Sequence, residues 1–522
     1  MSSQCPLGVV PVSRTTIFPS QNASRNPTGT PLSILDSRSS NWAPTAAFWV
    51  YDRPDQFATD LFVESLRLTL GMYPHWTGEV CFVDPIDVKD HRYRFRRLQV
   101  KYGFATDPGV DVIIAESDAS ILHLIPGYAL QDAWDASALP SAAFIPDDAL
   151  PPMAPGKPAA LVQFTTFADA FAIGVKLAHG LADAHTLVQF MRDWMNIHRR
   201  VPVTSAPLFD PTLLDRAAAG DIDSEGPDKS LLRQSLALPI LRYDYWASAS
   251  GAHPFMAETI RVPDQLDKEK IRPFGTPLPW HEWDVDAPVA QYVICFTSDE
   301  VHKMWLDAVA GLSHAERSAS ISHLDALLAF VWMLINRARG LAGDEQPVHL
   351  STILGLRNRL VPANFIGSPV IHVGVTCSGR EAASANNLRS IAWSIRTVIN
   401  SFTSDSLGAL LHDMAYEDTP HREWNGFFGR HHVIFTSWLR LGLYEMEFVE
   451  GVKPRFASSV MPAVDGVISM TEGLPARQDE STDSAEWWKN GIDVSLQLTE
   501  KAMDGLLADP LLRSYRSRNH HE

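Results

Sequence analysis

One pair of residues in this sequence has the side chains and the spacing to carry proton-transfer chemistry. His179 and Asp183 stand at the two ends of the stretch His-Gly-Leu-Ala-Asp. A histidine with an ordinary pKa of about 6.5 can take a proton from a hydroxyl group near neutral pH. Asp183 could then orient the imidazole or hold the loop in place. About one or two pairs at this spacing are expected by chance in a chain with 19 histidines, so a hydrogen-bonded histidine beside a helix N-cap is the alternative interpretation.

The residues around this pair predict two strands, a short loop and a helix. Residues 161–166 are extended and apolar, and apolar residues alternate with smaller or polar ones over 171–177. The next apolar positions follow helical spacing: Leu187, Phe190, Met191, Trp194 and Ile197. His179 has the parity of Leu177, so we expect it to point to the buried side where the strand gives way to the loop. Catalytic side chains are often found at such transitions.

The composition predicts a folded chain with two lobes. It has 522 residues, of which 45% are apolar, and a single hydrophobic core seldom covers this length. We expect a flexible arm over residues 1–30, an N-terminal lobe over 31–205, a proline-rich crossover linker over 206–288, and a C-terminal lobe over 289–522. Strand and helix patterns are mixed in both halves, so the expected class is α/β or α+β.

Charge and cysteine content exclude several kinds of partner. The net charge of −17 argues against a nucleic acid or an anionic membrane as partner, because both attract basic proteins. The four cysteines are scattered without Cys-x-x-Cys spacing, which excludes a disulfide scaffold and fits a reducing compartment.

The longest apolar run, residues 326–335, is too short to span a bilayer and predicts a buried helix, and the first residues lack the apolar core of a signal peptide. We therefore expect a cytoplasmic protein without a membrane anchor.

Other familiar site motifs are absent. The sequence contains no GxxxxGK[ST] phosphate loop, no GxGxxG fingerprint and no GxSxG nucleophile elbow. His431-His432 and His520-His521 lack partners at metal-ligand spacing, so no metal site is expected. Nothing independent therefore indicates a kinase, a dehydrogenase or a serine hydrolase.

A series of blocks resembles one known family. The block LVQFTTFADAFAIGVKLAHGLADAHTLVQFMRDWMNIHRR contains His179, and the others are, in chain order, PLSILD and SLRLTLGMYPHWTGEV before it, then SHLDALLAFVWMLINRAR, LGLRNRLVPANFIGSPV, FTSWLRLGLYEMEFVEGVKP and GIDVSLQLTEKAMDGLLADP after it. In content, order and spacing they resemble the BAHD acyltransferases, which move an acyl group from coenzyme A to an alcohol or amine. The resemblance is closest to fungal members such as trichothecene 3-O-acetyltransferases.

The resemblance implies a fold and a set of roles. The fold would be two chloramphenicol-acetyltransferase-like lobes, each a mixed sheet with helices, joined by the crossover. His179 would be the general base at their interface, and Asp183 would pair with Arg357 and hold the loop. Thr436 and Trp438 match positions whose hydrogen-bond donors face the tetrahedral oxyanion.

The resemblance also implies the partners. The donor would be an acyl-CoA, most commonly acetyl-CoA, used as co-substrate with no cofactor bound permanently. The acceptor would be a hydroxylated secondary metabolite, and the protein would be a monomer. Lys453, Arg455 and Ser322 are the expected contacts to the coenzyme.

One block departs from the family. Its Asp-Phe-Gly-Trp-Gly motif reads Glu447-Phe448-Val449-Glu450-Gly451 here, with one extra residue before Lys453. That motif is usually structural and lies along the coenzyme channel, so Glu447 and Gly451, like Arg357, are expected to have structural roles. The change concerns the shape of the channel rather than the base, and Glu450 adds a negative charge near an anionic ligand.

Two other functions are open at this point. Condensation domains of peptide synthetases share the His-x-x-x-Asp block and join carrier-bound acyl groups to amines. They usually double the histidine, whereas Ala178 precedes His179 here, and no carrier domain accompanies it. The altered Glu447–Gly451 block could instead mark a protein that binds or cyclises a metabolite without coenzyme A.

Overall fold

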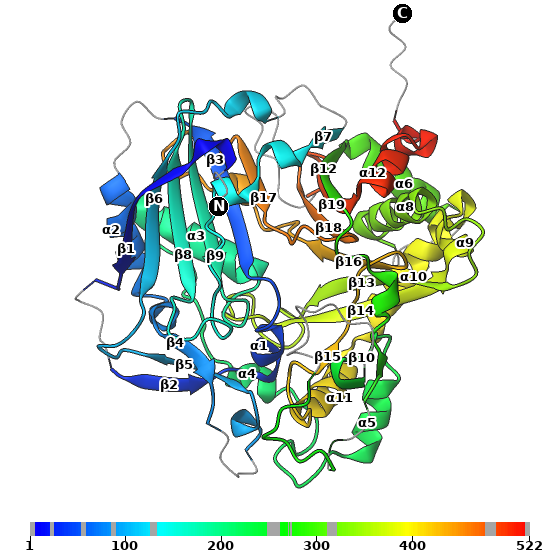
Figure 1. Ribbon diagram of the computed structural model, residues 1–522, viewed down its shortest axis with the longest axis horizontal. Helices are drawn as coiled ribbons and strands as arrows, with labels where there is room; N and C mark the ends of the chain where they lie inside the picture. Colours follow the sequence, from blue (N-terminus) through cyan, green and yellow to red (C-terminus); the bar gives the residue numbers. More distant parts are fainter. Residues whose placement is uncertain are drawn as a thin grey trace, which may run out of the picture.

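Two sheets, each with helices on its outer side, lie side by side in the computed structural model (Figure 1). It describes residues 6–20, 26–53, 59–84, 90–125, 133–247, 261–269, 271, 274–310, 321–474 and 487–516. The expected mixed class with two sheet-centred lobes is confirmed.

The first lobe is built on a six-stranded sheet covered by helices α2 (Thr59–Leu70) and α3 (Ala184–His198). In spatial order its strands are β1 (Val10–Ile17), β6 (Val110–Glu116), β8 (Ala160–Thr166), β9 (Ala170–Leu177), β3 (Thr45–Asp52) and β17 (Phe456–Ser459). One face of α3 is apolar at helical spacing, and its Phe190 and Trp194 are buried against the sheet.

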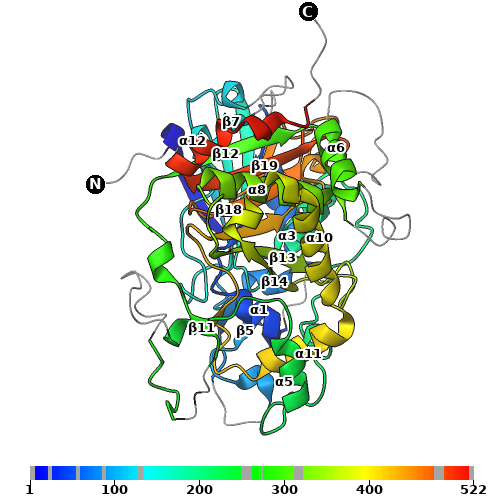
Figure 2. The same ribbon diagram turned by 90° about the vertical axis from the view of Figure 1, so that its right-hand side faces the viewer.

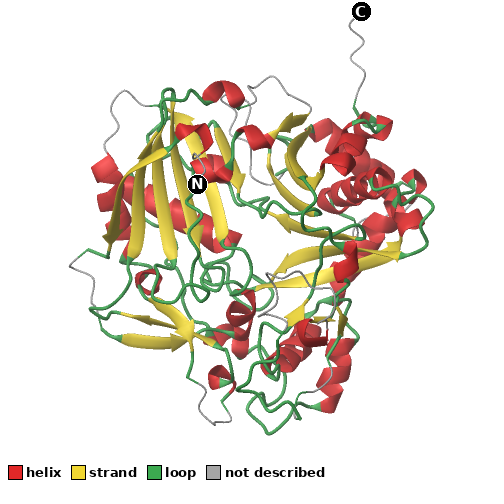
Figure 3. Cartoon of the chain, in the orientation of Figure 1, coloured by secondary structure: helices red, strands yellow, loops and turns green. Residues whose placement is uncertain are grey.

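The second lobe is built on a seven-stranded sheet. In spatial order its strands are β14 (Val370–Ser378), β13 (Pro347–Gly355), β16 (His432–Ser437), β18 (Val467–Glu472), β19 (Ile492–Thr499), β12 (Val289–Phe296) and β7 (Ala133–Asp135). Its helices α6 (Ser298–Val309), α8 (His323–Ala338), α10 (Leu388–Ser401) and α12 (Glu500–Leu507) gather on the side away from the first sheet (Figures 2 and 3).

Helix α8 is the expected buried apolar helix. Residues 326–335 are buried on every side of it, beneath the other helices and against the sheet. Within the described part of the chain, no helix combines the length and the apolar character needed to cross a membrane.

Smaller elements connect and flank the lobes. A three-stranded sheet of β2 (Thr28–Pro31), β5 (Leu98–Tyr102) and β4 (Glu79–Phe82) extends the first lobe, next to α1 (Ile34–Ser39). The crossover contains α4 (Thr212–Asp215), α5 (Lys229–Leu236), β10 (Tyr243–Asp244) and β11 (Thr276–Pro277), and it packs on β15 (Glu423–Trp424) and α11 (Ser404–Ala415). The second lobe also contains the short helix α9 (Gly379–Ala382). The described crossover residues therefore pack on the second lobe, and Asp215 and Asp223 also accept hydrogen bonds from the backbone N–H groups of Ile34 and His91 in the first lobe.

Over residues 6–20 and 26–30, the described part of the expected flexible arm, the structure has paired strands. Strand β1 pairs with β6 along its length, and β2 pairs with β5. Only Ile17 of β1 is buried, so this edge strand carries no apolar alternation that a sequence could reveal. Main-chain pairing holds it, together with Arg14 and Thr16, which both donate to Asp111 at 2.7 and 2.8 Å.

Two strands are exchanged between the lobes. β17 comes from the second half of the chain and pairs with β3 of the first sheet, whereas β7 comes from the first half and pairs with β12 of the second. Trp134 of β7 and Phe456 of β17 meet with ring centroids 5.5 Å apart. The two sheets are therefore linked at strands that lie outside the crossover.

A glycine in the strand that leads to His179 allows a loop to lie directly on the sheet. A Cβ atom on Gly174 would approach the carbonyl oxygen of Phe144 at 2.2 Å. We predict that Gly174→Ala lowers the free energy of unfolding by about 1–3 kcal/mol, because backbone must shift to admit the methyl group. Urea denaturation measures the change. Gly343→Ala is the matched control: its Cβ would meet nothing within 4 Å, so its stability should stay within about 0.5 kcal/mol of wild type. Equal stability of the two variants would contradict the prediction.

Candidate active site

His179 lies in the tight loop between β9 and α3. The loop is held at both ends, because Ala178 N–H donates to the carbonyl of Ala159 at 2.8 Å and Asp183 N–H donates to that of Gly367 at 3.2 Å. Asp183 is also the N-cap of α3, and its carboxylate accepts from Thr186 N–H at 2.9 Å. The local sequence places the imidazole at the start of the helix, and a residue of the second lobe fixes the loop there.

The Asp183 carboxylate and the Arg357 guanidinium form a buried ion pair between the lobes. Arg357 donates to the two carboxylate oxygens at 2.5 and 3.0 Å, and both side chains are only 8% exposed. Arg357 also donates to the hydroxyl of Thr186 and to the carbonyl of Phe365. Its charge holds the pKa of Asp183 below the ordinary value although burial opposes this. Asp183 therefore points away from the imidazole and ties the loop to the second lobe.

A serine that sequence reasoning missed lies against His179. The hydroxyl of Ser368 is 3.0 Å from Nδ1 of His179, and Ser368 N–H donates to Asp36 at 2.7 Å. A neutral imidazole that donates from Nδ1 to the Ser368 hydroxyl keeps its lone pair on Nε2. In the sequence, the only indication of Ser368 is its position in the turn Ile366-Gly367-Ser368-Pro369, which resembles the Tyr-Phe-Gly-Asn turn of the BAHD acyltransferases.

Burial shifts the pKa values of His179 and Asp36. It lowers the pKa of His179 below 6.5, partly offset by the hydrogen bond to its own carbonyl and by the charge of Asp183. Burial also raises the pKa of Asp36 to about 6, against hydrogen bonds from Ser33 and Ser368 that favour its charged form. His179 is therefore neutral at neutral pH, which is the state that accepts a proton.

The side chain of His179 borders a cavity of about 540 Å³ between the lobes. Trp42 packs edge-on against the imidazole, with ring centroids 5.0 Å apart. The cavity brings together five of the predicted site residues: His179, Asp183, Arg357, Thr436 and Trp438. Thr436 lies in β16 and is half-buried, and Trp438 follows that strand and is buried.

All three predicted coenzyme contacts lie outside this cavity. Ser322 is the N-cap of α8. Its hydroxyl donates to Asp325 and accepts from Arg396, so capping of the helix explains a serine at this position. Lys453 is exposed, and Arg455 lies 3.4 Å from Asp52. None of the three borders the described cavity.

The predicted structural residues of the altered block form a tight turn. Glu447 accepts from Gly451 N–H at 2.6 Å, and Gly451 has a positive φ of 77°. Phe448 between them is buried in the first-lobe core against Trp194, with ring centroids 5.1 Å apart. The block thus anchors the second half of the chain to the first lobe, while Glu450 is exposed.

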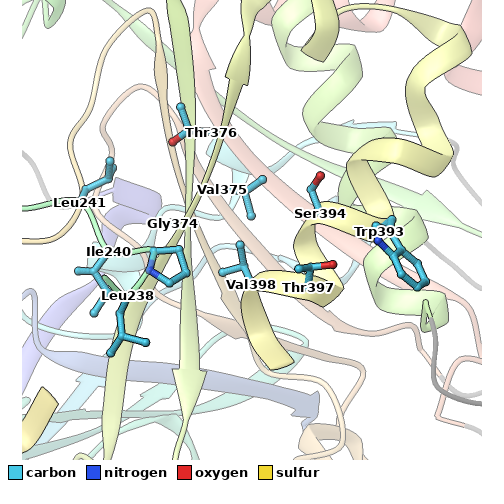
Figure 4. Close-up of a pocket in the computed structure, with 11 residues that line it drawn as sticks. Leu238, Ile240, Leu241, Gly374, Val375, Thr376, Trp393, Ser394, Thr397 and Val398 are labelled. Atoms are coloured by element: carbon cyan, nitrogen blue, oxygen red, sulfur yellow. The ribbon is translucent and has the colours of Figure 1, made fainter. Parts of the chain in front are cut away.

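A second cavity of about 530 Å³ lies outside this site, between residues 238–241, the edge strand β14 and helix α10 (Figure 4). Its lining consists of aliphatic side chains, Trp393 and the hydroxyls of Thr376, Ser394 and Thr397. None of its described lining residues has a titratable side chain, whereas His179 borders the first cavity.

Among the described residues, one group of side chains has the spacing to hold a metal ion. Asp90, His91 and Asp223 offer ligand atoms within 4.8 Å of one another, but His91 is already hydrogen-bonded to Asp223 at 2.9 Å and to Asp215 at 3.1 Å. His431 lies between Glu282 and Asp344 as a hydrogen-bonded histidine. His520 and His521 lie outside the described residues.

The chain is similar to known proteins both in sequence and in fold. The sequence model of the Transferase family matches residues 7–236 and 291–510. The chain is 25% identical to acyltransferase AFT15-1 of Alternaria alternata, over 94% of this chain and 95% of that protein, and 27% identical to acyltransferase abl6 of Leptosphaeria maculans, over 92% and 93%. The fold is similar to crystalline F. graminearum TRI101 complexed with coenzyme A and deoxynivalenol, with a TM-score of 0.67, 16% identity, and coverage of 94% of this chain and 99% of that one.

The buried ion pair generates a stability prediction. Asp183→Asn leaves the Arg357 charge buried without its partner, so we expect the free energy of unfolding to fall by about 3–5 kcal/mol at pH 7. Urea denaturation checks this. Glu345→Gln removes an exposed ion pair with Arg380 and should cost no more than about 1 kcal/mol. An Asp183→Asn protein as stable as wild type would refute the tethering role.

The contact with Ser368 generates a pKa prediction. Imidazolium is a stronger donor than neutral imidazole, so Ser368→Ala removes an acceptor that favours the charged form and lowers the pKa of His179 by about half to one pH unit. Diethyl pyrocarbonate modifies the neutral ring, and the pH midpoint of His179 modification, followed by peptide mass spectrometry, reports this pKa. Ser40→Ala removes a matched serine–histidine contact at His421 (2.6 Å) and should leave the midpoint unchanged. A midpoint that rises in Ser368→Ala would contradict donation from Nδ1 of His179 to Ser368.

Proposed function

Because the chain belongs to the Transferase family, the BAHD acyltransferases, we propose that it transfers an acetyl group from coenzyme A to a hydroxyl group of a secondary metabolite, with His179 as general base. The observation that carries this proposal is that a neutral imidazole, with Nδ1 engaged by Ser368, borders a cavity between the lobes. The acyltransferases AFT15-1 and abl6 and the coenzyme A complex of TRI101 support the choice of reaction and donor.

The proposed reaction is a direct transfer. Nε2 of His179 removes the proton of the acceptor hydroxyl while the hydroxyl oxygen attacks the thioester carbonyl carbon. The tetrahedral intermediate then collapses, the carbon–sulfur bond breaks, and the thiolate of coenzyme A takes the proton back from the imidazolium. No serine or cysteine side chain replaces the acceptor as nucleophile in this scheme, so no acyl-enzyme forms.

Thr436 and Trp438 are proposed to stabilise the oxyanion. Both border the same cavity as His179, on and just after β16 of the opposite lobe. A hydroxyl and an indole N–H are donors, and donors aimed at developing negative charge contribute several kcal/mol to transition-state stabilisation. The base and the oxyanion donors would then come from different lobes, with the thioester between them.

Lys453 and Arg455 are proposed to contact the phosphates of coenzyme A. They flank Pro454 immediately before β17, where the chain crosses from the second lobe to the first. Asp52 and Glu450 place negative charge near these two basic side chains. Their contacts are therefore expected to add modestly to the affinity for coenzyme A. The proposed active form is a monomer.

The role of His179 is tested by pH-dependent kinetics. We expect His179→Ala to lower thiol release from acetyl-CoA, measured with a panel of hydroxylated metabolites, by about 10²–10⁴-fold with folding intact. In the wild type, kcat/KM should fall as pH drops through an apparent pKa below 6.5, since burial lowers the pKa of the base and its protonated form accepts no proton.

His281→Ala is the control, because that side chain is 83% exposed. Unchanged turnover in His179→Ala would refute the base assignment. Absence of thiol release with every donor and acceptor would favour the chemistry without coenzyme A.

A further inference from the structure

Asp36, in helix α1, contacts both segments that hold the His179 imidazole. Its carboxylate Oδ1 accepts from Ser368 N–H at 2.7 Å, and the Ser368 hydroxyl lies 3.0 Å from Nδ1 of His179. Its backbone carbonyl oxygen lies against Gly180, where a Cβ atom would approach it at 3.0 Å. The hydroxyl of Ser39 lies 3.2 and 3.3 Å from the carbonyl oxygens of Asp36 and His179. One residue thus contacts the histidine loop of the first lobe and the Ser368 turn of the second.

Helix α1 is itself fixed between the lobes. All six of its residues are buried. Ile34 and Leu35 pack in a core cluster that includes Phe365 of the second lobe, and Ile34 N–H donates to Asp215 of the crossover at 2.9 Å. Packing therefore holds Asp36 in place independently of its contact with the Ser368 turn.

Helix capping accounts for only one of the two carboxylate oxygens of Asp36. Oδ2 accepts from the N–H and the hydroxyl of Ser33 at 3.2 and 2.6 Å, which is the geometry of a capping box. The hydrogen bond to Oδ1 comes from Ser368, 332 positions away in the chain. This bond fixes the backbone of the residue whose hydroxyl meets Nδ1 of His179.

The carboxylate is buried without a cation. Asp36 is 1% exposed, and no basic side chain among the described residues pairs with it. Asp325 occupies the same capping-box position in α8 and is equally buried, but it is paired with Arg396 at 2.6 Å. Burial above all, and also the like charge of Asp215, raises the pKa of Asp36 to about 6, so the ionised group lowers the stability of the fold at neutral pH. A group kept at such a cost is typical of a functional site.

We propose that Asp36 is a positioning residue for His179, whose carboxylate holds Ser368 where the serine hydroxyl accepts from Nδ1. A carboxylate is a stronger acceptor than a neutral oxygen, so the charge of Asp36 tightens the bond from Ser368 N–H. The contact fixes the imidazole at the cavity and favours the imidazolium that forms when His179 takes a proton. The effect on transfer rests on the proposed function, whereas the effect on the imidazole is present in the resting protein.

Variants on both sides of the Asp36–Ser368 contact test this inference. Asp36→Asn removes the charge at nearly the same shape, and Asp36→Ala removes every carboxylate contact, so either variant that folds carries the test. The combination Asp36→Asn/Ser368→Ala shows whether Asp36 acts through the serine. Glu381→Gln is the control, because Glu381 has the same capping-box position in α9 and is exposed.

Two quantities are measured for each variant. The first is the pH midpoint of His179 modification by diethyl pyrocarbonate, which requires no turnover. The second is kcat/KM at pH 8 for thiol release from acetyl-CoA, with the hydroxylated metabolite that the wild type turns over fastest.

We expect Asp36→Asn to lower the His179 midpoint by about half a pH unit and kcat/KM by about three- to tenfold, because one hydrogen bond that supports the imidazolium is weakened. Asp36→Ala should shift both quantities at least as far. In the Ser368→Ala background, Asp36→Asn should change neither quantity further, and Glu381→Gln should match the wild type in both.

A His179 midpoint that is unchanged in the Asp36 variants would overturn the inference, and so would shifts that add to that of Ser368→Ala. A shifted midpoint in a protein that releases no thiol, the wild type included, would sustain the inference while contradicting the proposed function. Transfer that depends on His179 while the Asp36 variants keep the wild-type midpoint and kcat/KM would do the reverse.

Discussion

The arrangement of this protein depends on one buried ion pair between its lobes. Asp183 caps the helix after the His179 loop, and Arg357 reaches it from the second lobe with two hydrogen bonds. Neither charge is tolerable alone in a buried position, so the lobes must stay in contact at this point. The position of the imidazole in the first lobe is thereby set by a residue of the second.

The turn after Arg357 extends this constraint to the imidazole itself. The carbonyl of Gly367 accepts from Asp183 N–H and from the hydroxyl of Thr186, and the next residue, Ser368, contacts Nδ1 of His179. Gly367 has a φ of 144°, and a Cβ atom there would approach a carboxylate oxygen of Asp36 at 2.9 Å. Only glycine fits so close an approach without strain, so the ion pair, the turn and the contact between Ser368 and His179 form one connected unit.

The cavity is lined by segments that carry little regular pattern. The crossover supplies Tyr245 and Trp283, and residues 423–428 supply three more side chains, whereas His179 lies in the short loop between the regular elements β9 and α3. Rigid elements thus position the imidazole, and irregular segments shape the rest of the cavity. The altered Glu447–Gly451 block supports the first lobe through Phe448 and does not border this cavity.

The sequence by itself determined those features that arise from local periodicity or from motifs. The strands and helix around His179, the buried helix α8 and the strand β19 follow from the spacing of their apolar residues, and the block order indicated the family and the pairing of Asp183 with Arg357. Tertiary structure alone decided the rest. Edge strand β1 and the exchanged strands β7 and β17 are too polar or too short to show alternation, and main-chain pairing holds them. Ser368 meets His179 across 189 positions of the chain, where hydrogen bonding depends on how the lobes pack and leaves no local trace in the sequence.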